Sequence, residues 1–164
     1  MASLKLADGV RLPVDAFVSR LLARLRVSVQ SVPLNLPSDI SALMARPDPT
    51  PTERERIAVA VDDLMARFRG IHRSRRRDLY APGNNSEAIV PGVTAAESDE
   101  LYVVLDGEGV FLFPGESDER SGLVVEVSSG DCLRIGRQVR HLITSVDGQP
   151  LRTLRYIVDD GTTR

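Results

Sequence analysis

The chain has 164 residues, a net charge of -2 at neutral pH and a hydrophobic fraction of 42%, which is enough for one core. That charge gives no general attraction to nucleic acid or acidic membranes, and no run approaches the roughly 20 apolar residues that span a bilayer. The single cysteine, Cys132, excludes an intrachain disulfide and a thiolate zinc cluster, and the absence of a secretory signal favours a cytoplasmic protein.

The first third of the chain is predicted to be helical and irregular. Apolar residues recur at helical spacing over 14–25, and Asp15 lies in the first turn of this segment. Alternating apolar residues over 27–36 indicate a short strand. In the segment 46–51 every second residue is a proline. This segment therefore cannot be the interior of a helix.

A second helix is predicted to begin at Thr52, because Thr52 and Glu55 form the Thr-x-x-Glu pattern of a capping box. Gly70 is expected to end this helix. The apolar stripe that should face the core consists of Ile57, Val61, Leu64, Met65 and Phe68.

A basic run with one histidine, His72, follows the second helix. Its arginines are Arg67, Arg69, Arg73, Arg75, Arg76 and Arg77. Such a run can bind phosphate or an acidic partner, but it has no interleaved aromatic residue and no glycine-rich cradle. We interpret it as a solvated face and loop, and residues 81–86, Ala-Pro-Gly-Asn-Asn-Ser, as a further loop.

The composition changes after Gly92, where short apolar runs alternate with glycine turns. A strand over 100–105 is expected to return over 110–113 through the turn Asp-Gly-Glu-Gly. Further strands are expected over 123–127, 132–135, 141–145 and 151–158. This spacing predicts an antiparallel sandwich or barrel, so the fold class is mainly β with an α-helical N-terminal part.

Two segments resemble the conserved motifs of the cupin superfamily. Residues 100–109, Glu-Leu-Tyr-Val-Val-Leu-Asp-Gly-Glu-Gly, are similar to the first motif. Gly130 and Asp131, followed ten residues later by His141, are similar to the second. The resemblance implies a cupin barrel, that is, a double-stranded β-helix or jelly roll.

Within the cupins the chain most resembles the acireductone dioxygenase family. Residues 26–34 are similar to a strand near that family's N-terminus, 53–68 to one of its helices, and Leu-Arg-Tyr at 154–156 to its closing strand. The resemblance implies a barrel over 91–164, with residues 1–90 packed on it as a helical and irregular extension. We expect the two parts to form one structural domain.

Members of that family bind Fe(II) or Ni(II) through His-x-His-x3-Glu on the first motif and a histidine on the second. Glu100 and His141 fall on two of these ligand positions, whereas Thr94 and Ala96 stand where the two early histidines would be. Two ligands hold a divalent first-row metal poorly. The resemblance therefore implies a degenerate metal site, with Glu100 and His141 as ligands only if a metal is bound.

The family's substrate-contacting arginine, two residues after the glutamate, is replaced by Tyr102, and the arginine of its closing strand corresponds to Arg155. Because side chains alternate across a strand, Glu100 and Tyr102 share a face, which the cupin register points inward together with His141. A carboxylate, a phenol and an imidazole in an apolar cavity can move protons without a metal. The catalytic candidates are therefore Glu100, His141, Tyr102 and Arg155, the last to hold an enolate or carboxylate.

Each candidate also has a purely structural interpretation. Glu100 and His141 can simply hydrogen-bond each other, and Tyr102 is a good core residue of a strand. Arg155 is a surface residue if the register is shifted by one position. Cys132 is expected to be a buried core thiol.

We expect an enzyme that isomerises, cyclises or dehydrates a small carbonyl-containing metabolite in a biosynthetic pathway, without a cofactor. One alternative is an Fe(II)- or Ni(II)-dependent oxygenase, similar to acireductone dioxygenase, with an altered ligand set. Another is a non-catalytic cupin that binds a small molecule. The expected partners are a small-molecule substrate and a second copy in a homodimer, with no nucleic acid and no membrane.

Overall fold

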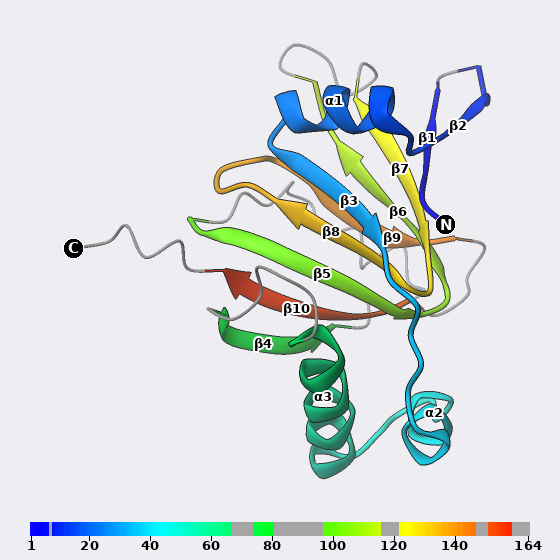
Figure 1. Cartoon of the computed structure of the whole chain (residues 1–164), viewed down its shortest axis with the longest axis vertical. Coiled ribbons are helices and arrows are strands. Elements are labelled where there is room, and N and C mark those ends of the chain that lie inside the picture. The colour runs from blue at the N-terminus through cyan, green and yellow to red at the C-terminus, as the bar shows by residue number, and fades with distance from the viewer. Residues whose placement is uncertain (7, 67–73, 81–96, 116–121, 147–150, 159–164) are drawn as a thin grey trace.

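The computed structural model describes residues 1–6, 8–66, 74–80, 97–115, 122–146 and 151–158 (Figure 1). In chain order its elements are β1 (Ser3–Lys5), β2 (Arg11–Pro13), α1 (Ala16–Arg24), β3 (Val27–Ser31), α2 (Ser38–Met44), α3 (Pro51–Met65), β4 (Ser74–Tyr80), β5 (Asp99–Asp106), β6 (Glu108–Phe113), β7 (Leu123–Ser128), β8 (Asp131–Ile135), β9 (Leu142–Ser145) and β10 (Arg152–Val158). The strands form two sheets, ordered β2-β1-β7-β6-β9 and β3-β8-β5-β10-β4, and their pairings are antiparallel. The predicted mainly β, antiparallel class is confirmed.

The space between the two sheets holds one hydrophobic core. Tyr102 of β5, Phe111 of β6 and Leu133 of β8 are buried there as members of one packed cluster. Helix α1 lies across one end of this space in Figure 1 and adds Val18 and Leu22 to the same core. The inward faces of both sheets are therefore mainly apolar, with a few buried polar side chains such as Glu100 and His141.

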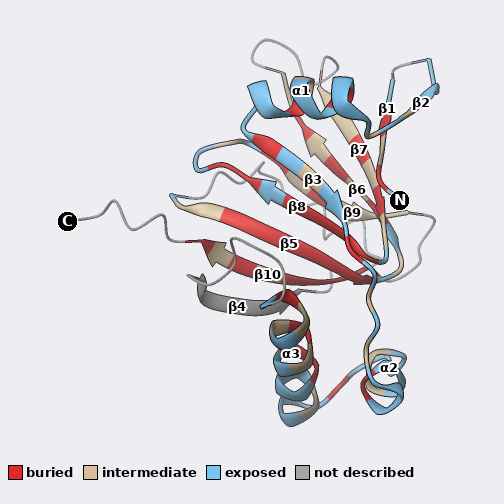
Figure 2. Ribbon diagram, viewed as in Figure 1, coloured by how far each residue is buried: buried red, intermediate tan, exposed pale blue. Residues whose placement is uncertain are grey.

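A second core lies on the outer face of the sheet that contains β5. Helix α3 packs on this face, with α2 beside α3 (Figure 2), and Val103 of β5 and Leu154 of β10 pack with Val61 of α3. Strand β5 is consequently buried on both faces, from Glu100 to Leu105. Double burial explains why its sequence is an unbroken apolar run instead of an alternating one.

Both long helices begin at a side-chain cap. The Asp15 carboxylate accepts two backbone N–H groups at the start of α1, so Asp15 caps the helix instead of lying in its first turn, where it was predicted. At α3 the capping box is formed by Thr50 and Glu53, so the predicted start at Thr52 is wrong. Pro51 favours the earlier start, because proline suits the first position of a helix. The helix ends at Met65, before the predicted end, and Phe68 and Gly70 lie outside the described residues.

The strands predicted after Gly92 are all present, with boundaries within two residues of those expected. The N-terminal part contains more strand than the sequence suggested. Strand β1 pairs with β7, β3 with β8 and β4 with β10, so segments on both sides of residue 90 belong to the same two sheets. The division into an extension and a barrel stays a prediction.

The part of the basic run at 75–77 lies in β4, whereas 67–73, with His72, and the predicted loop at 81–86 lie outside the described residues. None of the described helices is long and apolar enough to cross a membrane.

Candidate functional site

The strand register brings the four predicted site residues to the space between the sheets. Glu100 and Tyr102 lie two residues apart on β5, and Tyr102 is the cross-strand neighbour of Arg155 on β10. The residues on either side of Arg155, Leu154 and Tyr156, belong to the outer core, so Arg155 lies on the inner face. His141 directly precedes β9 and therefore approaches from the other sheet.

The four side chains are in contact. Glu100 Oε2 lies 3.2 Å from His141 Nε2, and the Tyr102 hydroxyl lies 3.4 Å from each of these two atoms. Arg155 Nη1 donates to Glu100 Oε1 over 3.3 Å. The side chains of Glu100 and His141 are only 5% and 2% exposed, and burial at this depth requires that a charged group has partners. We call this group the Glu100–His141 cluster.

The hydrogen bonds around His141 fix where its proton lies. Its Nδ1 is 2.9 Å from the carbonyl oxygen of Val139, which can only accept, so Nδ1 carries a hydrogen. The other nitrogen, Nε2, faces a carboxyl oxygen of Glu100. The contact thus pairs two acid–base groups directly in a buried setting.

Tyr102 is a neutral hydrogen-bond donor in this environment. Burial, and then the negative charge of Glu100, raise the pKa of the Tyr102 phenol well above its ordinary value, while Arg155 opposes the shift. The ring is also held by an edge-on contact with Phe111, with centroids 5.3 Å apart. The phenol can therefore donate to an oxygen near the cluster without being ionised itself.

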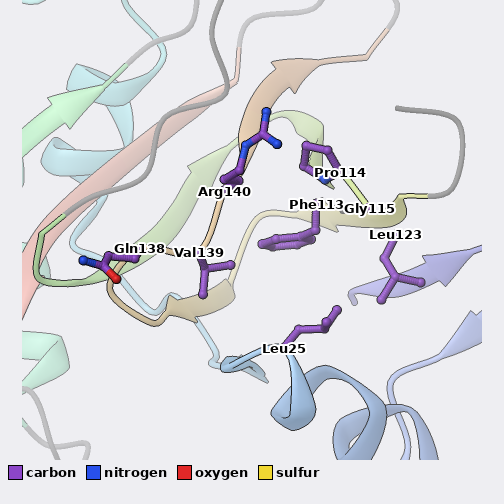
Figure 3. Close-up of a pocket in the computed structure, with 8 residues that line it drawn as sticks. All are labelled: Leu25, Phe113, Pro114, Gly115, Leu123, Gln138, Val139 and Arg140. Atoms are coloured by element: carbon purple, nitrogen blue, oxygen red, sulfur yellow. The ribbon is translucent and has the colours of Figure 1, made fainter. Parts of the chain in front are cut away.

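A pocket of about 430 Å³ lies beside the loop that precedes β9 (Figure 3). Apolar side chains of Leu25, Phe113, Leu123 and Val139 line it, together with Gln138 and Arg140. Val139 connects the pocket to the Glu100–His141 cluster, because it also provides the carbonyl oxygen that contacts His141. The pocket's lining includes none of the four predicted site residues. Sequence patterns did not indicate it, since its residues come from ends of elements that are distant in the chain.

Other residues with reactive side chains have structural roles. Cys132 belongs to the outer core, and burial, with the charge of Asp131, raises the pKa of its thiol to about 12. A thiol with so high a pKa is a poor nucleophile, in agreement with its interpretation as a core residue. Asp131 is buried and accepts hydrogen bonds from the Ser31 hydroxyl and the Ser128 N–H.

Two facing antiparallel sheets with this strand order are consistent with a cupin fold. No protein-family model matches the chain, and none of the curated proteins matches it. Among solved structures, the acireductone dioxygenase from Bacillus anthracis with a cadmium ion in its active center matches with a TM-score of 0.69. The match covers 98% of this chain and 94% of that one at 20% sequence identity, and it shows that the two share a fold. The predicted resemblance to acireductone dioxygenases is thus confirmed at the level of the fold.

A weaker match is a variant of the oxalate decarboxylase of Bacillus subtilis, at 12% identity and a TM-score of 0.36. It covers 59% of this chain and 29% of that chain. A score of this size does not establish a shared fold.

The residues of the cluster do not fit a metal centre of the kind that the family resemblance implies. Within the described residues, no group of three or more His, Cys, Asp and Glu side chains could hold a metal ion. Glu100 and His141 face each other, and the Arg155 cation next to the carboxylate opposes a second cation there. Thr94 and Ala96 lie outside the described residues, and alanine has no side-chain ligand atom.

Proposed function

We propose that this chain is a cupin-fold enzyme that moves protons on a small carbonyl-containing metabolite without a bound metal. The observation that supports it is the buried Glu100–His141 pair, whose carboxylate and imidazole lie 3.2 Å apart beside a neutral phenol and a guanidinium. Isomerisation, cyclisation and dehydration all need such a proton relay. A biosynthetic pathway is the expected setting.

Each residue has a distinct role in this proposal. The Glu100–His141 pair takes a proton from the carbon next to the carbonyl group, and the electron pair left behind moves onto the carbonyl oxygen as an enolate. Tyr102 donates a hydrogen bond to that oxygen. Return of the proton to another carbon completes an isomerisation, whereas its transfer to a departing hydroxyl group releases water. Arg155 positions the Glu100 carboxylate.

Hydrogen–deuterium exchange tests this proposal without knowledge of the natural substrate. A panel of 2-oxo acids and hydroxyketones is incubated with the protein in D2O, and loss of the signal from the α-proton is followed by NMR. We expect exchange above the buffer rate, reduced about 100-fold or more in Glu100→Gln, because positioned acid–base groups contribute about 10²–10⁴-fold. Arg137→Gln, an exposed change outside the cluster, is the control. Equal exchange in wild-type protein and a folded Glu100→Gln variant would contradict the proposal.

Metal content distinguishes this proposal from the oxygenase with an altered ligand set. The purified protein is measured by elemental mass spectrometry before and after reconstitution with Fe(II), Ni(II) and Zn(II). We expect far less than one metal ion per chain, because only two donors face each other in the cluster. Near-stoichiometric metal that is lost in His141→Ala would instead favour the oxygenase.

A non-catalytic small-molecule-binding protein is the second candidate. It is favoured by the fact that the buried side chains of the cluster are already hydrogen-bonded to one another, while the pocket is lined by other residues. In that case ligands bind the pocket and no member of the panel exchanges its protons above the buffer rate. A homodimer and a cytoplasmic location remain predictions.

A further inference from the structure

The pocket has the size and lining of a site for a small organic molecule. Its volume, about 430 Å³, lies within the range of roughly 300–1,000 Å³ that is typical of ligand pockets. Four apolar side chains form most of the lining and Arg140 provides a charged group, whereas the amide of Gln138 is turned away from the other side chains (Figure 3). An apolar wall with few polar groups orients a ligand by those groups.

The charge next to the pocket is positive. Among the described residues, the guanidinium groups of Arg137 and Arg140 have no hydrogen-bond or ion-pair partner. The nearby carboxylate of Asp99 is already occupied, because it binds the Arg134 guanidinium over 2.9 Å and lies 3.8 Å from that of Arg26. Of these arginines only Arg140 lines the pocket, so its charge is available to a ligand.

The loop that carries Arg140 is held in a defined conformation. The N–H of Gly136 donates to the Arg26 carbonyl and that of Arg137 to Asp99, each over 2.8 Å. Between them and Arg140, Gln138 has a φ of 61°, which is unfavourable for a residue other than glycine and persists where surrounding contacts enforce it. These contacts fix the backbone from which Gln138, Val139 and Arg140 reach the pocket.

We propose that the pocket binds the apolar body of an amphipathic carboxylate and that Arg140 pairs with its carboxylate group. A guanidinium matches a carboxylate through two parallel hydrogen bonds, and one unpartnered guanidinium balances one negative charge. The inference rests on the proposed function and narrows its substrate class to organic acids with an apolar portion. Val139 is the residue that links the pocket to the cluster, because it lines the pocket and its carbonyl oxygen contacts the His141 imidazole.

Ligand-observed NMR titrations with octanoate and with the uncharged 1-octanol test the proposal. We expect wild-type protein to bind octanoate more tightly than octanol. Arg140→Gln should lower the affinity for octanoate at least about fivefold and leave the affinity for octanol almost unchanged. Arg137→Gln is the matched control, since this arginine is on the same loop but outside the pocket, and should bind as wild type does. Leu25→Trp, a change at a 40% exposed residue, should fill the pocket and weaken both ligands.

The outcomes separate this inference from the proposed function. Equal octanoate affinity in wild type and Arg140→Gln, or an equal loss in Arg137→Gln, would overturn the assignment of Arg140. Octanoate binding that survives Leu25→Trp would overturn the pocket as the site. Glu100→Gln should retain octanoate binding, because Glu100 does not line the pocket. If wild-type protein binds octanoate but exchanges no protons, the catalytic proposal fails and the pocket assignment stands.

Discussion

Tyr102 shows how one residue changes the chemistry of a buried polar cluster. A phenol between a carboxylate and an imidazole adds a hydrogen-bond donor without adding a charge, since its pKa is raised by burial and by Glu100. The Arg155 guanidinium, in contrast, reaches the same carboxylate from the next strand and is 32% exposed. The cluster thus combines a neutral buried donor with a partly solvated cation.

The raised pKa of Tyr102 predicts a dependence of stability on alkaline pH. An unfolded tyrosine ionises near pH 10, whereas Tyr102 in the folded chain keeps its proton to higher pH, so the unfolding free energy falls as pH rises above about 10. Urea unfolding from pH 8 to 11 should show a steeper fall in the wild type than in Tyr102→Phe. The difference between the two proteins isolates Tyr102, because Cys132 contributes to both. Parallel curves would show that Tyr102 titrates normally.

The four residues of the cluster were accessible to sequence reasoning, and the pocket was not. Alternation along β5 fixes which face Glu100 shares with Tyr102, and a recognisable pair of motifs locates both Glu100 and His141. The pocket depends on how the end of α1, the end of β6 and the loop before β9 meet in space. No local sequence pattern predicts that these three segments lie together. The residues next to Arg140 in the sequence also give no sign that Arg140 lines a binding site.

At the scale of single elements, sequence patterns predicted helices and strands correctly where the patterns were strong. They missed strands that form only by pairing with a distant part of the chain. The start of α3 was misplaced because two Thr-x-x-Glu patterns overlap, and Pro51 favours the first of them. Strands β1 and β2 have three residues each, too few for an alternating pattern, and the first half of β4 belongs to a basic run. These strands form because a neighbouring strand offers backbone partners, which propensity does not reveal.

The two overlapping capping patterns provide a matched pair of variants. Thr50→Ala removes the cap of α3 and should lower the unfolding free energy by about 1 kcal/mol. Thr52→Ala changes an exposed residue just inside the helix and should alter it by less than about 0.5 kcal/mol. Chemical denaturation at pH 7 measures both. An equal cost in the two variants would argue against Thr50 as the cap.

For the whole molecule, the central fact is that β5 contributes to both hydrophobic cores. Its inward residues, such as Val104, pack between the sheets, and its outward residues, such as Val103, pack against the helices. Neither core can be lost without exposing one face of the same strand. This arrangement agrees with a single structural domain, which the sequence predicted but which strand pairing alone does not prove.

If the two cores form one unit, they should unfold together in a single cooperative transition. Leu133→Ala in the inter-sheet core and Leu154→Ala in the helix-facing core should each cost about 2–5 kcal/mol, because both side chains are fully buried. Each variant should still unfold in one transition, with the same midpoint by far-ultraviolet circular dichroism and by tyrosine fluorescence. Two separate transitions in either variant would show that the cores unfold independently.

The contacts already formed among the side chains of Glu100, Tyr102 and His141 have a consequence for selectivity among ligands. A polar group that enters must exchange one existing hydrogen bond for another, so the exchange itself yields little net free energy. Apart from the ion pair with Arg140, affinity must then grow with the apolar surface that the ligand removes from water, at about 25 cal/mol per Å². Short, strongly hydrated acids should be weak ligands, and each added methylene group should strengthen binding until the pocket is full.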